Sequence, residues 1–319
     1  MDLPGQLLFT IGIVMLIGAL VRGQQWGWSS PELLALASGA VATLAAFTAV
    51  EYLRRRPMFD LSLLRERSFA GASVAAFATS ASLFGMFVYL TFYFQAVEQL
   101  SPLSTGVRFL PVTIVALLAA TAAGRLSGSV APRAMLGGAL TCSALGLVQM
   151  TMLADGGGWT VILPGLILSG IGFGVANPTV AAVTLAVTAP SRVGTATGMN
   201  STFRQVGIAA GVAGLGALFH LRFTDSLGPD AAKGLSEASS TLGVAGISAS
   251  AEARFAAAFV DGLHSVFLVS AAIAALGAIF VIASVRVAAG ARSEPGEPFV
   301  DPTLEVSDPW QPQTSTSPN

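Results

Sequence analysis

The stretch Thr160–Val187, TVILPGLILSGIGFGVANPTVAAVTLAV, contains no Asp, Glu, Lys or Arg. A helix of this length crosses a bilayer hydrocarbon core of about 30 Å. Because no water reaches that core, backbone N–H and C=O groups must pair with one another, and a helix achieves this within one segment. The stretch therefore predicts a transmembrane helix.

Seven further stretches of similar length carry few charges. They are Leu3–Val21, Leu33–Leu53, Ala70–Ala96, Gly106–Leu126, Ala134–Leu153, Met199–Leu221 and Ala256–Val287. Of the 319 residues, 53% are hydrophobic and 10% are charged, whereas soluble domains carry about 25% charged residues. We expect an all-α integral membrane protein, an eight-span helical bundle whose main partner is the lipid bilayer.

The distribution of basic residues predicts the orientation of the chain. One side of the predicted membrane holds Arg54, Arg55, Arg56, Arg65, Arg67, Arg125, Arg133, Arg192, Arg204, Arg286 and Arg292. The other side holds Arg22, Arg108, Arg222, Lys233 and Arg254. Since the richer side of a membrane protein faces the cytoplasm, we expect a multi-pass protein of the cell membrane with both termini cytoplasmic.

Three segments lie outside the predicted spans. Residues 54–69 mix apolar and basic side chains, which favours a cytoplasmic amphipathic helix on the membrane surface, with a plain linker as the alternative. Residues 223–254 form a predicted outer loop. Residues 290–319 are rich in Pro, Ser, Thr and acidic residues and are predicted to be disordered.

Composition argues against several classes of function. The net charge of −1 gives no field that would attract nucleic acid. A lone Cys142 with His220 and His264 predicts neither a metal site nor a cofactor. No nucleophile elbow, zinc-binding helix or paired intramembrane carboxylate is found, so an enzyme is not expected. The deep parts of the spans also lack a carboxylate that could carry a proton.

Prolines, glycines and two arginines are the candidates for conformational roles. Pro111 is predicted to interrupt the fourth span, and Pro164 and Pro178 the sixth, because a helix-interior proline removes a hydrogen bond and kinks the helix. Kinked spans near the midplane are where transporters often bind substrates.

The spacing of Gly170 and Gly174 indicates close helix packing, or surfaces that slide during a conformational cycle. Arg204, at the predicted start of the seventh span, is either an interfacial anchor or part of an inner gate.

A second set of residues is predicted to line a substrate cavity. Phe77, Phe84 and Phe87 recur at helical spacing with Ser80 on the same side of the third span. This face either packs on lipid and neighbouring helices or lines a pocket for bulky apolar or cationic compounds. On the sixth span the candidates are Ser169 and Asn177, and Asn177 either satisfies a carbonyl freed by Pro178 or faces the cavity.

Four segments together resemble the major facilitator superfamily, most closely bacterial drug:proton antiporters with fourteen spans. The longest is Leu90–Pro111, LTFYFQAVEQLSPLSTGVRFLP. The others are Asp60–Phe69, Gly124–Arg133 and Gly194–Gly207. The resemblance runs from Asp2 to Val287, and it places Arg125 in a loop that takes part in the family's conformational cycle. Gly128 and Ser129 stand where the family's loop has Asp and Arg, so its charged inner latch is in doubt.

The resemblance implies an architecture and a function. Residues 1–53 would be two extra central helices, and residues 70–289 a six-helix C-terminal bundle built as a 3+3 inverted repeat, with the first six spans missing. The implied function is proton-coupled efflux of drugs or other small amphipathic molecules by a truncated C-terminal part. We expect it to work with a separately encoded N-terminal six-helix half; the alternative is a non-transporting accessory subunit or inactive fragment.

Overall fold

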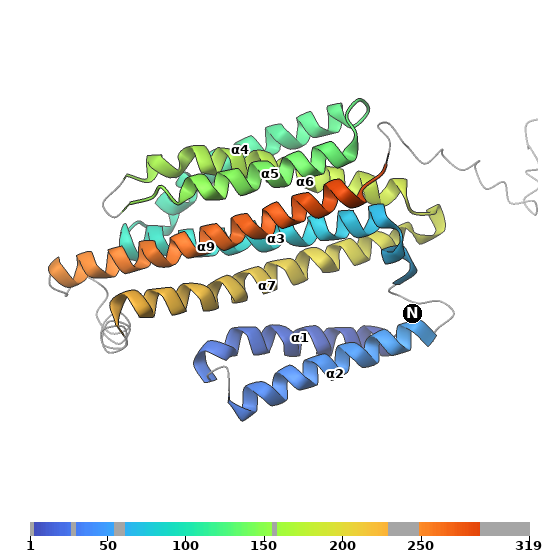
Figure 1. Ribbon diagram of the computed structural model, residues 1–319, viewed down its shortest axis with the longest axis horizontal. Helices are drawn as coiled ribbons and strands as arrows, with labels where there is room; N and C mark the ends of the chain where they lie inside the picture. The colour runs from blue at the N-terminus through green and yellow to red at the C-terminus, as the bar shows by residue number, and fades with distance from the viewer. Residues whose placement is uncertain (1–2, 27–29, 54–60, 155–157, 229–248, 288–319) are drawn as a thin grey trace, which may run out of the picture.

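The computed structural model describes residues 3–26, 30–53, 61–154, 158–228 and 249–287 (Figure 1). These ranges contain eight long α-helices and no strand. The helices are α1 (Leu3–Trp26), α2 (Pro31–Leu53), α3 (Arg67–Phe92), α4 (Pro102–Leu126), α5 (Pro132–Met150), α6 (Leu163–Ala186), α7 (Val193–Leu227) and α9 (Ala249–Ser284). Short helical turns cover Leu61–Arg65, Tyr93–Val97, Trp159–Ile162 and Pro190–Arg192. The all-α membrane fold predicted from the sequence is confirmed.

Six of these helices are long and apolar enough to span a membrane, and α1 contains a shorter apolar segment, Gly5–Ala19. Helix α4 begins four residues before its predicted apolar stretch because a polar cap starts it. At α4 the side chain of Ser101 accepts a hydrogen bond from the backbone N–H of Ser104 (3.2 Å), and Pro102 occupies the first helical position. Both are favoured helix starts.

The helices from α3 onward form one bundle, and α1 and α2 lie beside it as a hairpin that contacts α7 (Figure 1). The bundle consists of two triplets, α3–α4–α5 and α6–α7–α9. The first helix of each triplet packs on the second helix of the other, α3 on α7 and α6 on α4, while α5 packs on α9. This reciprocal packing is the pattern of a 3+3 inverted repeat.

Several predicted boundaries change. Pro164 is the second residue of α6 and does not interrupt it, because the first turn of a helix tolerates proline. Pro111 and Pro178 do lie inside their helices. Helix α7 continues to Leu227 and α9 begins at Ala249, so both enter the predicted 223–254 loop. Residues 54–60, 229–248 and 288–319 lie outside the described residues, so part of the predicted 54–69 linker, most of the predicted loop and the whole predicted tail are not described. The described part of the linker holds the helical turn Leu61–Arg65 and the start of α3 at Arg67.

Glycines hold the closest helix pairs together. A methyl group at Gly207 of α7 would lie 2.6 Å from the carbonyl oxygen of Phe77 on α3, and one at Gly211 would overlap the carbonyl of Ala81. On α6 a methyl group at Gly170 would lie 2.7 Å from the carbonyl oxygen of Val112 on α4, and Gly174 meets the next turn of α4 in the same way. Only glycine permits backbones to approach this closely.

We expect Gly211→Ala to lower the melting temperature of the detergent-purified protein, because overpacking at a helix contact costs about 1–3 kcal/mol. Gly214→Ala is the matched control: it lies on the same helix, with nothing within 4 Å of the added methyl group. Alanine is the better helix former by about 1 kcal/mol, so this control should unfold at the same or a higher temperature. Equal stabilisation by both substitutions would contradict the α3–α7 contact.

Candidate substrate cavity

A cavity of about 200 Å³ lies between α3, α6 and α7. Its polar lining residues are Thr79, Ser80, Asn177, Thr184, Thr197, Asn200, Ser201 and Arg204, and the others are Ala76, Ala176, Val180 and Ala181. The cavity exists because α3 packs closely on α7 and α6 on α4, while α6 and α7 make few contacts with each other. A partly open hollow that carries several polar groups thus lies between helices whose outer faces are apolar.

A hydrogen-bonded chain fixes one wall of the cavity. The hydroxyl of Ser73 on α3 donates to Asn200 Oδ1 on α7 (3.2 Å), and Asn200 Nδ2 donates to Thr184 Oγ1 on α6. Thr184 in turn donates to the carbonyl of Val180 (2.8 Å). Three helices are joined through buried polar atoms, and breaking such a network leaves buried groups unpaired at about 1–3 kcal/mol each.

Two of the predicted cavity residues, Ser80 and Asn177, lie among the lining residues. Asn177 Nδ2 also donates to the carbonyl oxygen of Phe173 (3.0 Å). This is not the carbonyl that Pro178 frees, which belongs to Gly174, four residues before the proline. Asn177 therefore lines the cavity and makes a local backbone hydrogen bond at the same time.

Phe84 and Phe87 lie further along α3, in an aromatic cluster. The ring of Phe84 is 6.2 Å from that of Phe173 on α6, and the ring of Phe87 is 5.4 Å from that of Phe109 on α4. Both pairs meet edge to face, a favourable arrangement for aromatic rings. These residues follow the lining residues along α3, so the cluster lies beyond the cavity lining, toward the end of the bundle where α4 begins.

The structure corrects the placement of two predicted cavity residues. Ser169 is fully buried at the α5–α6 interface, where a methyl group at Gly146 would lie 2.7 Å from its hydroxyl oxygen. Phe77 is half-buried on the α3 turn that meets Gly207, and it is not among the lining residues. Helical spacing identified the correct helices for both, but not the direction in which each side chain points.

Arg204 lies about three turns into its helix and not at the helix start. Helix α7 begins at Val193, so Arg204 is about 16 Å along it at 1.5 Å per residue. Its exposed side chain lines the cavity. Arg125 is exposed near the end of α4. A buried carboxylate that sequence reasoning overlooked is Glu51, only 2% exposed near the end of α2 and outside this cavity.

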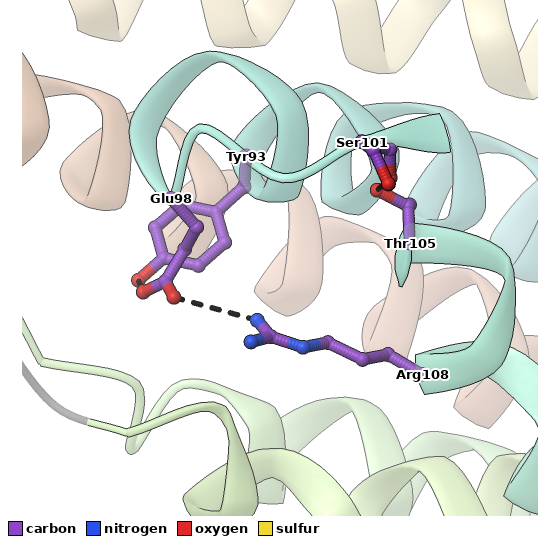
Figure 2. Close-up of polar contacts among 5 residues, drawn as sticks. All are labelled: Tyr93, Glu98, Ser101, Thr105 and Arg108. Atoms are coloured by element: carbon purple, nitrogen blue, oxygen red, sulfur yellow. Dashed lines mark hydrogen bonds and ion pairs between the residues drawn. The ribbon is translucent and has the colours of Figure 1, made fainter. Parts of the chain in front are cut away.

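A polar cluster not foreseen from the sequence lies where α3 turns into α4 (Figure 2). Arg108 is 3.4 Å from the carboxylate of Glu98, which also accepts a hydrogen bond from the hydroxyl of Tyr93 (3.1 Å). The guanidinium of Arg108 lies over the rings of Phe94 and Trp159, at 5.2 and 5.3 Å. In the sequence, the available signal was the opposite charges of Glu98 and Arg108, ten residues apart across the connection between the third and fourth predicted spans.

We expect the Glu98–Arg108 pair to contribute little to stability. Partly exposed ion pairs are worth about 0–1 kcal/mol, and here the two side chains are 27% and 19% exposed. A double-mutant cycle of Glu98→Gln and Arg108→Gln, measured by thermal unfolding, should give a coupling below about 1 kcal/mol.

Arg108→Lys separates the two contributions, because lysine keeps the charge and loses the planar stacking on Phe94 and Trp159. If Arg108→Lys loses more stability than the coupling energy of the ion pair, the stabilisation comes mainly from stacking of Arg108 on the aromatic rings. A coupling several times greater than expected would show that the pair is shielded from solvent.

An all-helical bundle with six membrane-capable helices and a hollow between three of them is the architecture of a polytopic membrane protein of the transporter class. The sequence model of the Major Facilitator Superfamily matches residues 5–212. The chain belongs to this superfamily.

Curated relatives carry names associated with antibiotic resistance and export. A puromycin resistance protein of Streptomyces alboniger is 33% identical over 217 residues, which cover 67% of this chain and 43% of that protein. A probable actinorhodin transporter of Streptomyces coelicolor is 29% identical over 265 residues, covering 80% of this chain and 46% of that protein. The chain thus spans about half the length of the curated relatives it matches.

A solved structure shares the fold. The crystal structure of a bacterial homolog of the human lysosomal transporter Spinster, described as inward-facing and occupied, aligns with a TM-score of 0.58 at 16% identity. The alignment covers 89% of this chain and 69% of that one.

Proposed function

We propose that the chain forms one wall of an exporter of small amphipathic molecules in the cell membrane, with both termini cytoplasmic. The observation that carries the proposal is the polar cavity between α3, α6 and α7 inside a bundle with apolar outer faces. The resistance and export names of the relatives support the same direction of transport.

A second wall has to come from elsewhere in the working transporter. Alternating access requires two units that rock about a site between them. Drug-sized ligands occupy about 300–1,000 Å³, whereas this cavity measures about 200 Å³. We propose that six further helices, on the same polypeptide or separately encoded, complete the site.

The coupling ion in this proposal is the proton. Among the described residues that line the cavity there is no Asp or Glu, so the carboxylate that carries the proton belongs to the companion helices. In this scheme the arginine-rich ends of the helices face the cytoplasm, as the positive-inside rule predicts.

The lining residues have distinct proposed roles. Ser80 and Asn177 contact polar groups of the substrate, and Phe84 and Phe87 contact its apolar part. The close α4–α6 seam at Gly170 and Gly174, together with the prolines Pro111 and Pro178, lets α4 and α6 move as the site opens. Arg125 and Arg204 belong to the cytoplasmic half of that movement.

Dye efflux in a bacterial host that lacks its own multidrug exporters tests the two-wall proposal. The chain is expressed alone and together with a six-helix unit of the same superfamily encoded beside it. We expect efflux only from the pair. Full efflux by the lone chain as a monomer would overturn the proposal, and membrane insertion of the pair without efflux would favour an accessory subunit.

Asn177→Ala and Phe84→Ala should each change the ratio of transport rates between two dyes by about tenfold, the effect of losing about 1.4 kcal/mol of substrate contact. Membrane abundance, measured by immunoblot, should change by less than about twofold, since Asn177 is only partly buried and surface changes cost little stability. Leu276→Ala is the control, because Leu276 is 66% exposed on α9. Parallel loss of abundance and transport would assign both residues to packing instead.

A further inference from the structure

The charge of the cavity wall is unbalanced. Arg204 is the one ionisable side chain among the described lining residues. No Asp or Glu of the described chain lies within 4 Å of Arg204. By contrast Arg108, at the other end of the bundle and outside the cavity, forms an ion pair with Glu98. Arginine stays protonated at any physiological pH. An ionisable side chain on a membrane-spanning helix by default indicates function.

A second, independent feature points into the same cavity. Thr79 on α3 lines it, is only 4% exposed, and its hydroxyl has no hydrogen-bond partner. The buried hydroxyls of Ser143, Ser169, Thr188, Thr224 and Ser270 also lack a partner, but none of these residues lines the cavity. A buried hydroxyl without a partner costs about 1–3 kcal/mol of stability. A ligand atom that accepts a hydrogen bond from Thr79 would remove this cost.

The rest of the wall determines which ligand atom fits. Asn200 lies one helical turn before Arg204, so their side chains share a face of α7. Its amide is already engaged by Ser73 and Thr184 and is held in place. Thr197 and the amide nitrogen of Asn177 donate to carbonyls of their own helices. The donors left for a ligand are the guanidinium of Arg204 and the hydroxyls of Thr79, Ser80 and Ser201. Arg204 carries the only charge among them, and none of these groups offers a negative charge.

We propose that Arg204 and Thr79 form an oxyanion subsite, which selects amphipathic compounds that carry an ionised acidic oxygen, such as a carboxylate, sulfonate or phenolate. The acidic group binds Arg204 through charge-assisted hydrogen bonds, and the apolar body extends toward the Phe84–Phe173 pair. This inference rests on the proposed function and narrows its substrate class, because the same wall gives an organic cation no counter-charge.

Direct binding to the purified 319-residue chain in nanodiscs tests the subsite without requiring transport. The probes are the fluorescent anion anilinonaphthalene sulfonate and phenylnaphthylamine, which has the same aromatic rings without the sulfonate. Fluorescence of empty nanodiscs is subtracted. The variants are Arg204→Gln, Arg204→Lys and Thr79→Val, with Arg133→Gln as the control because Arg133 is an exposed arginine at the start of α5, away from the cavity.

We expect Arg204→Gln to weaken binding of the anionic probe about tenfold and that of the neutral probe less than about twofold, since one charge-assisted hydrogen bond is lost. Arg204→Lys should retain most of the anionic preference. Thr79→Val should cause a smaller loss, about threefold, because a neutral hydrogen bond is weaker. Arg133→Gln should bind both probes as the unsubstituted chain does.

Equal weakening of both probes, or no effect of Arg204→Gln, would overturn the subsite while leaving the efflux experiment to decide the proposed function. Failure of the unsubstituted chain to bind the anionic probe would also overturn the subsite. Binding is then repeated with the companion helices present. Loss of the anionic preference there would show that Arg204 pairs with a carboxylate of the opposite wall, which also overturns the inference.

Discussion

Contact between helix backbones at glycine is the interaction on which this bundle depends. In a bilayer, lipid tails are as apolar as leucine, so burial of apolar surface does not drive helices together and close packing has to do so. Gly207 and Gly211 bring α7 against the carbonyls of α3, and Gly170 and Gly174 bring α6 against α4. The two seams occupy corresponding places in the two triplets, and they set the distances between all the helices around the cavity.

The cavity is a consequence of these seams. Helices α6 and α7 are each drawn toward a different partner, which leaves space between them on the side of α3. The space is lined by small and hydroxyl side chains rather than by Leu or Phe, and the Ser73–Asn200–Thr184 chain spans one of its walls. Beyond the lining residues, toward the start of α4, α3 and α6 meet through the rings of Phe84 and Phe173.

Length and hydropathy sufficed to predict all eight helices, because the bilayer imposes helical structure on any long apolar stretch. They could not predict rotation about each helix axis. Ser169 and Asn177 both belong to α6, yet one faces α5 and the other the cavity. Pro164 does not interrupt α6 because this helix begins only at Leu163, whereas the apolar stretch extends further upstream, and Arg204 lies within α7 because that helix begins before its apolar stretch. Asn200 acquires its role from partners on α3 and α6, and Thr79 from its place in the cavity wall.

The helical turn at Tyr93–Val97 is wider than an α-helical turn: the N–H of Glu98 reaches back five residues to the carbonyl of Tyr93 (3.1 Å). Such a turn amounts to one residue inserted into an α-helix. Removing one residue there would rotate everything that follows, Glu98 and Arg108 together, by about 100° relative to α3, the angle per residue of an α-helix with 3.6 residues per turn. The direction in which the chain enters α4 thus depends on one residue of this turn, and an in-frame deletion of its codon would re-aim this end of the bundle relative to α3.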